Sequence, residues 1–304
     1  MVLTETAYAK VNLALHVRRR REDGYHDLES LFVFVEGGDA LRAEPRKDGE
    51  LRLTIDGPFS EGLDSGPDNL VMRAAKALQL AVCPEYGRGT VSQPLPKRRS
   101  ASGGNTQRFG TNLHLTKNLP VASGIGGGSA DAAAALRLLN RLWDCGLDDR
   151  QLCAIAETLG SDIPACVISR TLRVEGRGEA LEPLELPGLS GILILLVNPG
   201  IPLGTAPVFK GWDQCDLGPL DTSSLDAIIR QGRNDLEAPA RTLVPQIGYV
   251  LDRLTALPGV MLSRMSGSGA TCFALFDSQQ ACNIAHTTLA SEQPGWWTMS
   301  GLLR

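Results

Sequence analysis

The sequence predicts an α+β protein with two domains. Segments with the periodicity of strands and of helices are interspersed along the chain, and the pattern changes at about residue 170, where a predicted hairpin and a buried strand follow two helices. With 304 residues, 43% of them hydrophobic and 21% charged, the chain can bury a substantial core. We therefore expect one domain over residues 1–169 and a second over residues 170–304.

Four segments of the first domain are typical of strands. Residues 4–17 and 28–35 alternate loosely between apolar and polar side chains, and the polar stretch RRREDGYHD between them indicates a turn. These two segments form a predicted hairpin. Residues 51–55 add another strand, and residues 112–121 form one that leads into a glycine-rich segment.

Helical periodicity marks a segment at residues 68–82, for which Asp68 is the expected N-cap. Its apolar face is expected to consist of Leu70, Ala74, Ala77, Leu78 and Ala81. Residues 129–143 predict a helix with one buried face, which consists of Ala132, Ala135, Leu136, Leu139 and Trp143. A third helix over residues 149–160 ends at Gly160, before a sharp turn at SDIP.

The second domain shows a different succession of elements. Residues 171–184 predict a hairpin, 192–198 a buried strand and 243–257 a helix. A strand at 272–276 follows the turn SGSGAT. The chain has no internal sequence repeat.

Residues 84–110 are rich in Pro, Gly, Ser and Arg and show no periodicity, which predicts a mobile loop. The alternative is a basic lid that contacts phosphate through Lys97, Arg98 and Arg99. Runs of charge are more often simply solvated, which favours the loop.

Composition limits the classes of function. The net charge of −4 gives no general attraction to nucleic acid or membranes, and the longest apolar run, ILILLV, is far shorter than a membrane span. The first residues lack the pattern of a signal peptide, so we expect a cytoplasmic protein. Seven cysteines without a CxxC pair and four histidines without HxxxH spacing predict buried free thiols and no built-in metal site.

Residues 124–136, GIGGGSADAAAAL, place a glycine cluster before a helix-forming run. Bare backbone lets N–H groups approach a ligand closely, and the start of a helix adds partial positive charge, so this arrangement favours an anion such as phosphate. The segment is neither a Walker A motif nor GxGxxG, because Ser129 takes the place of the last glycine, and the HRD and DFG motifs of protein kinases are absent. The alternative is a tight turn from a strand into a helix.

The longer segment PVASGIGGGSADAAAAL resembles the phosphate-binding motif of the GHMP kinases. AYAKVNLALHV and LSRMSGSGATCFALF resemble the first and third motifs of that superfamily, in the expected order over nearly the whole chain. The resemblance implies the two-domain GHMP kinase fold, with an N-terminal ribosomal-protein-S5-like nucleotide-binding domain and a C-terminal ferredoxin-like domain. It also implies that ATP is used with Mg²⁺.

The same resemblance implies which residues bind ATP. Ser129 is expected near the phosphates and magnesium, and Asn69 and Leu70 are expected to border the adenine. The phosphate-binding segment consists of Pro120, Val121, Ala122, Ser123, Gly124, Ile125, Gly126, Gly127, Gly128, Ser129 and Ala130.

Further segments resemble a subgroup of the GHMP kinases. In this subgroup the phosphoryl acceptor is a branched polyol that carries cytidine diphosphate. These segments are DGYHDLESLF, GSDIPACV, EGRGEAL, NPGIPLGTAPVF and RNDLE. The implied reaction is phosphorylation of the tertiary 2-hydroxyl of that polyol, in the synthesis of isoprenoid precursors.

For the acceptor, the resemblance implies that Tyr25 and Phe209 sandwich the cytosine ring and that His26 reads the edge of the base. Asn12 and Thr205 match polar contacts to the substrate. Without the resemblance, the simpler interpretation is a core phenylalanine, a surface tyrosine and a solvated histidine.

Asp162 of GSDIP matches the catalytic aspartate of the superfamily, and Lys10 of YAKVN matches the lysine that orients it and offsets developing charge. Taken alone, Asp162 is typical of a residue that caps a turn, and Lys10 of a surface lysine.

Two other functions stay open. One is a GHMP kinase for another small alcohol of the homoserine or mevalonate type, and the other is a non-catalytic nucleotide-binding sensor with the same fold. The expected partners are small molecules, ATP and the acceptor, with no nucleic acid and no membrane. The sequence leaves open the oligomeric state and whether a protein carboxylate binds magnesium.

Overall fold

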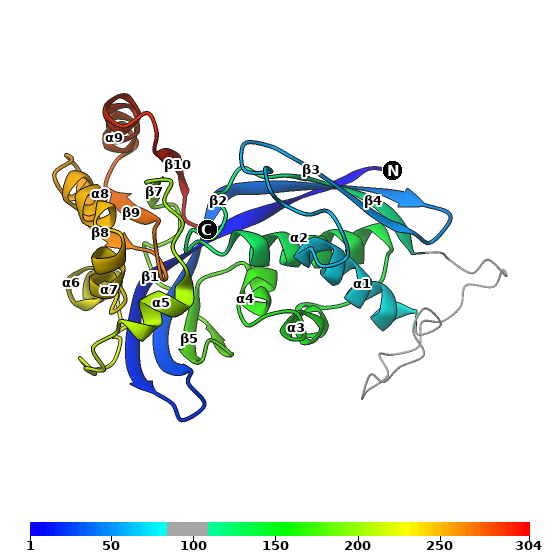
Figure 1. The fold of residues 1–304 in the computed structure, drawn as a ribbon, viewed down its shortest axis with the longest axis horizontal. Coiled ribbons are helices and arrows are strands. Elements are labelled where there is room, and N and C mark those ends of the chain that lie inside the picture. Colours follow the sequence, from blue (N-terminus) through cyan, green and yellow to red (C-terminus); the bar gives the residue numbers. More distant parts are fainter. Residues whose placement is uncertain (84–108) are drawn as a thin grey trace. The chain divides into compact units, whose positions relative to one another are not determined.

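A computed structural model describes residues 1–83 and 109–304 of the chain (Figure 1). The predicted loop at 84–110 lies outside the described residues except for Phe109 and Gly110, and Gly110 begins a strand. The alternative basic lid at residues 97–99 also lies outside them.

The chain forms two compact units. Unit 1 consists of Met1–Ala7, Asp39–Asn118 and Gly128–Ile168. Unit 2 consists of Tyr8–Gly38, Leu119–Gly127 and Ser169–Arg304. The division into domains at residues 169 and 170 stays a prediction.

Two long strands contribute to both units. Strands β1 (Leu3–Arg20) and β2 (His26–Arg46) pair with each other; β1 is close to the predicted strand, and β2 extends 11 residues beyond its predicted end. In unit 1, the second half of β2 pairs antiparallel with β4 (Gly110–Thr116), which pairs in parallel with β3 (Leu51–Asp56). Strand β4 ends five residues before the predicted strand does, because Lys117 to Val121 already belong to the approach to the glycine segment.

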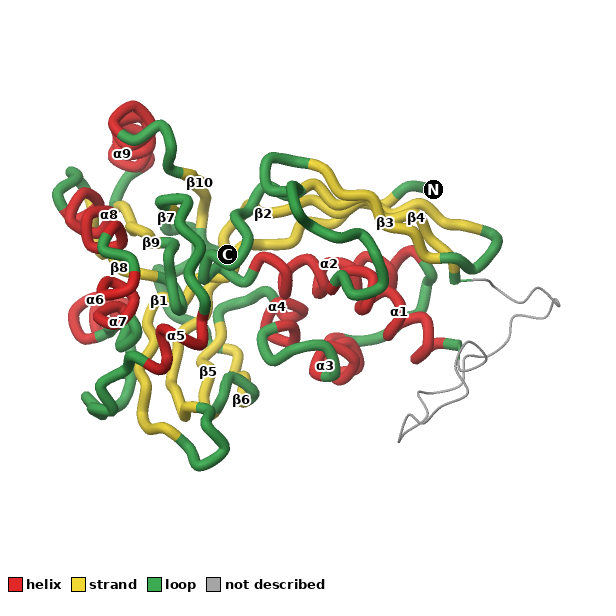
Figure 2. Tube along the Cα trace, viewed as in Figure 1, coloured by secondary structure: helices red, strands yellow, loops and turns green. Residues whose placement is uncertain are grey.

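Four helices lie on one side of the strands of unit 1, with α2 next to them (Figures 1 and 2). They are α1 (Leu70–Val82), α2 (Gly127–Leu142), α3 (Asp149–Glu157) and α4 (Ile163–Ile168). Helix α4 was missed, because the SDIP motif was interpreted as a turn alone.

Two details of these helices correct the sequence-based expectations. The N-cap of α1 is Asn69 and not Asp68, because the Asn69 side chain accepts a hydrogen bond from the backbone N–H of Val71. Helix α1 buries a face shifted by about one residue, made of Val71, Ala74, Ala75, Leu78 and Gln79. Helix α2 is buried on nearly all sides from Ala130 to Leu136, whereas one buried face was expected, because small alanine side chains let neighbouring elements approach it closely.

Unit 2 contains an antiparallel four-stranded sheet in the order β10-β7-β9-β8. Its strands are β7 (Leu193–Asn198), β8 (Val260–Met265), β9 (Cys272–Phe276) and β10 (Trp297–Leu302). The predicted hairpin at 171–184 is present as β5 (Leu172–Gly176) and β6 (Ala180–Pro183), and β5 pairs with the first half of β2.

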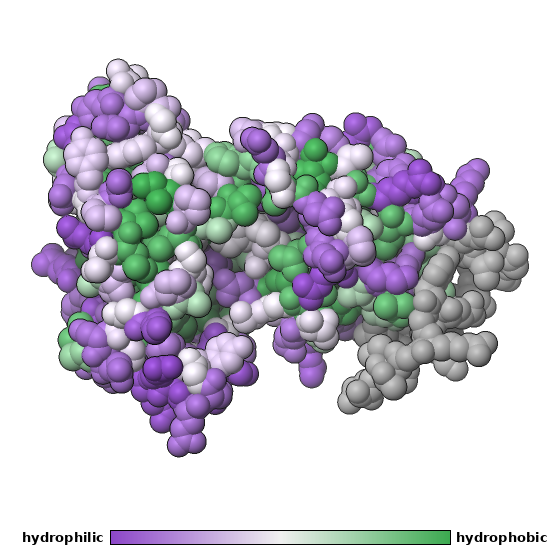
Figure 3. Space-filling view, viewed as in Figure 1, coloured by the Kyte–Doolittle hydropathy of each residue, from purple (hydrophilic) through white to green (hydrophobic). Residues whose placement is uncertain are grey.

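The helices of unit 2 are α5 (Thr205–Lys210), α6 (Leu225–Gln231), α7 (Glu237–Leu243), α8 (Gln246–Thr255) and α9 (Gln279–Glu292). Only α8 was predicted, and it begins later than expected, because Pro245 lies between it and α7 and cannot continue a helix. Helix α9 buries only Cys282, Ala285 and Leu289, and hydrophilic residues cover it in Figure 3.

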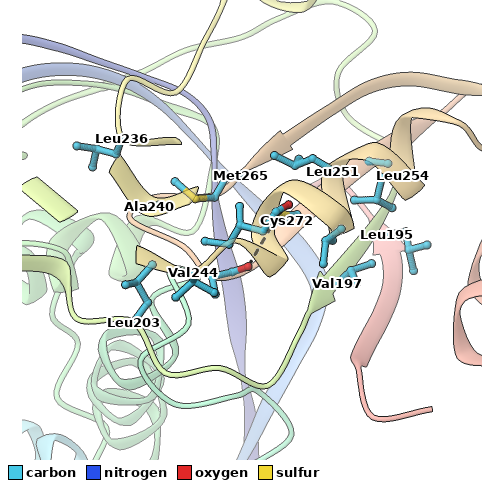
Figure 4. Packing of buried hydrophobic residues seen from close by; sticks show 14 of the residues in the cluster. Leu195, Val197, Leu203, Leu236, Ala240, Val244, Leu251, Leu254, Met265 and Cys272 are labelled. Atoms are coloured by element: carbon cyan, nitrogen blue, oxygen red, sulfur yellow. Dashed lines mark hydrogen bonds between the residues drawn. The ribbon is translucent and has the colours of Figure 1, made fainter. Parts of the chain in front are cut away.

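The four-stranded sheet has apolar residues on both faces, because successive side chains of a strand point to opposite sides. Leu195 and Val197 of β7 belong to one core cluster, and Ile194 and Leu196 to another. Figure 4 shows the first cluster, where Leu251 and Leu254 of α8 lie among the side chains that include Leu195 and Val197.

All seven cysteines are free thiols, as predicted, although only three are buried and Cys215 is exposed. No helix among residues 1–83 and 109–304 combines the length and apolar character that a membrane crossing requires.

Candidate active site

The three motifs that carry the resemblance meet within unit 2. The backbone N–H of Lys10 donates to the carbonyl of Ile125 in the glycine segment at 3.0 Å. The backbone N–H of Thr271, at the end of the SGSGAT turn, donates to the carbonyl of Ser123 at 3.1 Å. The turn and strand β1 therefore both fix the backbone of the glycine segment.

One hydroxyl joins all three motifs. The Ser266 hydroxyl accepts from the backbone N–H of Asn12 at 3.1 Å and donates to the carbonyl of Gly124 at 3.0 Å. Ser266 is fully buried, so that this junction is shielded from water.

Glycine is required at two positions of the segment. Gly124 has φ +79°, and a Cβ there would lie 2.6 Å from the Ser266 carbonyl oxygen and 2.7 Å from that of Gly269. Gly126 has φ +66°, and a Cβ there would lie 3.2 Å from Cε of Lys10. These glycines thus let the segment approach the SGSGAT turn and Lys10 closely.

Helix α2 begins at Gly127, so the glycine segment leads directly into a helix N-terminus, where backbone N–H groups lack partners within the helix. Val121, Ala122 and Gly128 are exposed, and Ser129 is half-buried. The remaining residues of the predicted phosphate-binding segment are buried or half-buried. This arrangement is able to bind an anion, and contact with phosphate stays a prediction.

The two predicted catalytic residues lie in different units. Lys10 of unit 2 is 4% exposed, and its Nζ lies 3.9 Å from the centre of the Phe32 ring, a cation–π contact. Asp162 of unit 1 is half-buried and precedes α4, and its carbonyl accepts from the N–H of Cys166. Their joint action stays a prediction.

An aromatic cluster in unit 2 contains His26 and Phe209, and their contact with cytosine stays a prediction. Their ring centroids are 5.0 Å apart, and Trp212, which sequence reasoning missed, meets His26 edge-on at 5.7 Å. Burial, followed by the positive charge of Arg20, lowers the pKa of His26, so that the neutral ring carries one donor and one acceptor near pH 7. Tyr25 is 61% exposed, with the Arg177 guanidinium 5.4 Å from its ring.

The predicted polar contacts Asn12 and Thr205 both adjoin the SGSGAT turn. The Asn12 amide donates to the Ser30 hydroxyl at 2.9 Å, and its Oδ1 is buried with no hydrogen-bond partner among the described residues. Such an acceptor is costly unless a ligand or solvent donor meets it. The Thr205 hydroxyl lies 3.1 Å from that of Ser268.

In unit 1, the residues expected near adenine already have structural contacts. Asn69 caps α1 and donates through Nδ2 to the Asp64 carbonyl at 2.8 Å. The Leu70 side chain lies 3.4 Å from the position of a Cβ on Gly128, beside the start of α2. Contact with adenine stays a prediction for both residues.

Comparisons with known proteins show which family the sequence matches. The family model described as "GHMP kinases N terminal domain" matches residues 69–170, and "GHMP kinases C terminal" matches residues 220–287. A 4-diphosphocytidyl-2-C-methyl-D-erythritol kinase of Rhizorhabdus wittichii is 50% identical over 99% of this chain and 94% of its own length. A protein of the same name from Sphingopyxis alaskensis is 46% identical over 99% of both chains.

The chain belongs to the GHMP kinase family.

Solved structures confirm the predicted α+β fold of a two-domain GHMP kinase. A crystal structure of 4-(cytidine 5'-diphospho)-2C-methyl-D-erythritol kinase matches with a TM-score of 0.75 and 33% identity over 99% of both chains. Homoserine kinase from Cytophaga hutchinsonii matches with a TM-score of 0.71 but 18% identity, over 99% of this chain and 94% of that one, which shows the fold alone.

This GHMP kinase also contains a buried charge cluster in unit 1 that sequence reasoning missed. The Lys117 ammonium donates to Oδ2 of Asp39 and, at 2.7 Å, to Oδ2 of Asp131, the fifth residue of α2. Burial raises the pKa of the Asp131 carboxyl to about 8, with Lys117 opposing the rise and Asp39 adding to it. No spacing in the sequence links these residues, because Asp39 comes from β2, Lys117 from the position just after β4 and Asp131 from α2.

Proposed function

We propose that this GHMP kinase transfers the γ-phosphoryl group of ATP to the 2-hydroxyl of 4-diphosphocytidyl-2-C-methyl-D-erythritol and releases ADP. The observation that carries the proposal is the identity of 42–50% to several curated proteins of that name, over at least 96% of this chain. The reaction would belong to the cytoplasmic non-mevalonate pathway of isoprenoid synthesis.

The aromatic cluster supports the proposal that the phosphoryl acceptor carries a nucleobase. The side chains of His26, Phe209 and Trp212 lie together, and a neutral histidine offers both a donor and an acceptor to the edge of cytosine. Homoserine and mevalonate contain no aromatic ring that could stack on this cluster. The cluster therefore favours the cytidine compound over the other small alcohols.

The chemistry needs alignment of the two substrates and neutralisation of charge more than covalent help from the protein. An alcohol is about as weak an acid as water, with pKa about 15.7, while an ordinary aspartate titrates near 3.9, so early deprotonation would cost about 16 kcal/mol. Asp162 would first orient the 2-hydroxyl. It would accept the proton only as the new P–O bond forms and the bond to the ADP oxygen breaks, while Lys10 offsets negative charge.

ATP would bind at the glycine segment and the start of α2, where Gly124 and Gly126 leave the backbone bare. Magnesium would enter with the ATP phosphates, whose charge it partly neutralises.

The test is ADP release from ATP and Mg²⁺ with the cytidine compound, homoserine or mevalonate as acceptor. We expect turnover with the cytidine compound alone and a loss of at least about 10²-fold in kcat for Asp162→Asn. Asp148→Asn is the matched control, because Asp148 also precedes a helix of unit 1 and asparagine caps as well as aspartate does. Binding of ATP without turnover of any acceptor would favour the nucleotide sensor.

A further inference from the structure

Asn234 lies in the RNDLE segment between α6 and α7. Both the nitrogen and the oxygen of its side-chain amide form hydrogen bonds with backbone groups. Asn234 is 7% exposed. Its Nδ2 donates to the carbonyl of Met265 at 2.7 Å and to that of Gly267 at 2.8 Å, while Oδ1 accepts from the N–H of Leu236 at 3.0 Å. The side-chain amide of Asn234 thus donates to the carbonyls of both residues that flank Ser266.

The residues beside Asn234 are themselves fixed to strand β1. The backbone of Leu15 donates to the Arg233 carbonyl at 2.8 Å and accepts from the N–H of Asp235 at 2.9 Å. The Asp235 carboxylate also accepts from the N–H of Val17 at 2.7 Å and pairs with Arg233 at 2.7 Å. Asn234 is therefore anchored to the strand that carries Lys10 and Asn12.

The segment that Asn234 holds borders the predicted acceptor contacts. A Cβ on Gly267 would lie 3.3 Å from Oδ1 of Asn12 and 2.9 Å from the Gly124 carbonyl oxygen. The next residue, Ser268, contacts the hydroxyl of Thr205. A displacement of this segment would therefore move the surroundings of Asn12 and Thr205.

We propose that Asn234 is a positioning residue that fixes Met265–Ser268 and thereby sets the affinity for the acceptor. The inference rests on the proposed function, because it assigns Asn12 and Thr205 to acceptor binding. The Ser266 hydroxyl also donates to the Gly124 carbonyl of the glycine segment. That segment depends less on Asn234, however, because the hydrogen bonds of Ile125 with Lys10 and of Ser123 with Thr271 hold it independently of Met265–Ser268. The effect is thus expected on the acceptor more than on ATP.

The test compares the wild type with Asn234→Asp. Aspartate keeps the shape and the acceptor for Leu236, but it replaces the donating amide with an oxygen that faces two carbonyls. We expect the KM for the acceptor to rise at least about tenfold, with kcat and the KM for ATP changed by less than about threefold. Hydrogen–deuterium exchange should become faster in peptides that cover residues 265–271.

Asn140→Asp is the matched control. Asn140 of unit 1 also holds backbone with both ends of its amide, donating to the Leu147 carbonyl at 2.8 Å and accepting from the Leu147 N–H at 3.0 Å. Its variant is expected to lose stability while the acceptor KM and the exchange of residues 265–271 stay at wild-type values. If Asn234→Asp does not fold, Asn234→Ser, which is smaller and uncharged, is measured in the same way.

An unchanged acceptor KM in a folded Asn234 variant would overturn the proposal, and so would equal rises in KM for both substrates. If the wild type does not phosphorylate the cytidine compound, the proposed function fails. Exchange at residues 265–271 then decides alone whether Asn234 positions the segment: faster exchange supports it and unchanged exchange overturns it.

Discussion

The imidazole of His26 lies against the ring of Phe209, with 5.0 Å between the ring centroids and 36° between the ring planes. Loss of the phenyl ring removes a flat face beside the neutral histidine. We expect Phe209→Ala to raise the KM for the cytidine substrate about 5- to 150-fold, because stacking of one base on an aromatic ring contributes about 1–3 kcal/mol. Steady-state kinetics should show little change in the KM for ATP.

The control for Phe209→Ala is Tyr249→Ala, which breaks another aromatic pair of unit 2, with Trp296 at 5.7 Å. It should leave both KM values unchanged. Equal effects of the two substitutions would refute the role of the His26 cluster in base binding.

Gly124→Ala should impair both folding and ATP binding. The new methyl group would lie 2.6 Å from the Ser266 carbonyl oxygen at a backbone φ of +79°. We expect a loss of about 1–3 kcal/mol in the free energy of unfolding, measured with denaturant, and a KM for ATP raised at least about tenfold.

Gly188→Ala separates backbone strain from the close approach at Gly124. Gly188 has a similar φ of +81° but nothing within 4 Å of an added Cβ. It should cost about 1 kcal/mol and leave the KM for ATP unchanged. If the Gly124 variant behaves like the Gly188 variant, the close approach of Gly124 to the Ser266 carbonyl contributes neither to stability nor to ATP binding.

Two substitutions at Asn69 distinguish helix capping from a contact with adenine. Asn69→Ala removes the cap of α1 and the hydrogen bond to the Asp64 carbonyl, and it should lower the free energy of unfolding by about 1 kcal/mol. Asn69→Asp loses only the exposed hydrogen bond to Asp64 and keeps a capping oxygen, so it should cost less. If Asn69 contacts adenine, both variants raise the KM for ATP. If only the alanine variant changes anything, Asn69 acts as a cap alone.

Asp131 should make the stability of the protein fall with rising pH. Its folded pKa, raised by burial to about 8, lies above the ordinary value of 3.8, so the folded state retains a proton that the unfolded state releases. The stabilisation is complete below about pH 4 and is lost as the pH rises through about 8. Lys117 stays charged throughout this window because its own pKa is raised: burial lowers that pKa, but the neighbouring Asp131 and Asp39 side chains raise it more.

Denaturant unfolding between pH 5 and pH 9 checks this expectation. Asp131→Asn removes the titrating group and keeps an oxygen for Lys117, so its free energy of unfolding should decline less over this range than that of the wild type. Parallel pH profiles of the two proteins would contradict the assignment.

Local patterns predicted the glycine segment and the helix after it, because a glycine cluster before an alanine-rich run is a signal contained in a few residues. The same local view misjudged details. Asp68 and Asn69 are both good caps, and only the hydrogen bond to Val71 shows which one acts. Periodicity also gave α2 one apolar face, since alanine is too small to reveal burial on its other sides.

Contacts between residues far apart in the chain could not be predicted from local sequence patterns. The N–H of Asn12 meets the Ser266 hydroxyl across 254 positions of the chain, and no spacing encodes that. Trp212 and Asn234 were missed as parts of the site for the same reason, because their partners come from distant segments. The family resemblance supplied Lys10, Asn12 and His26, and their roles in the reaction stay predictions.

The chain passes between the two units five times, after Ala7, Gly38, Asn118, Gly127 and Ile168. Val11, Leu13 and Leu31 therefore fill the same core as Ile194 and Phe273, from the opposite half of the gene. A fragment that begins at residue 170 would lack part of its own interior and would expose apolar strands to aggregation. Residues 1–169 and 170–304 should therefore fold only when they are produced together, as two fragments of a split enzyme, and not when each is expressed alone.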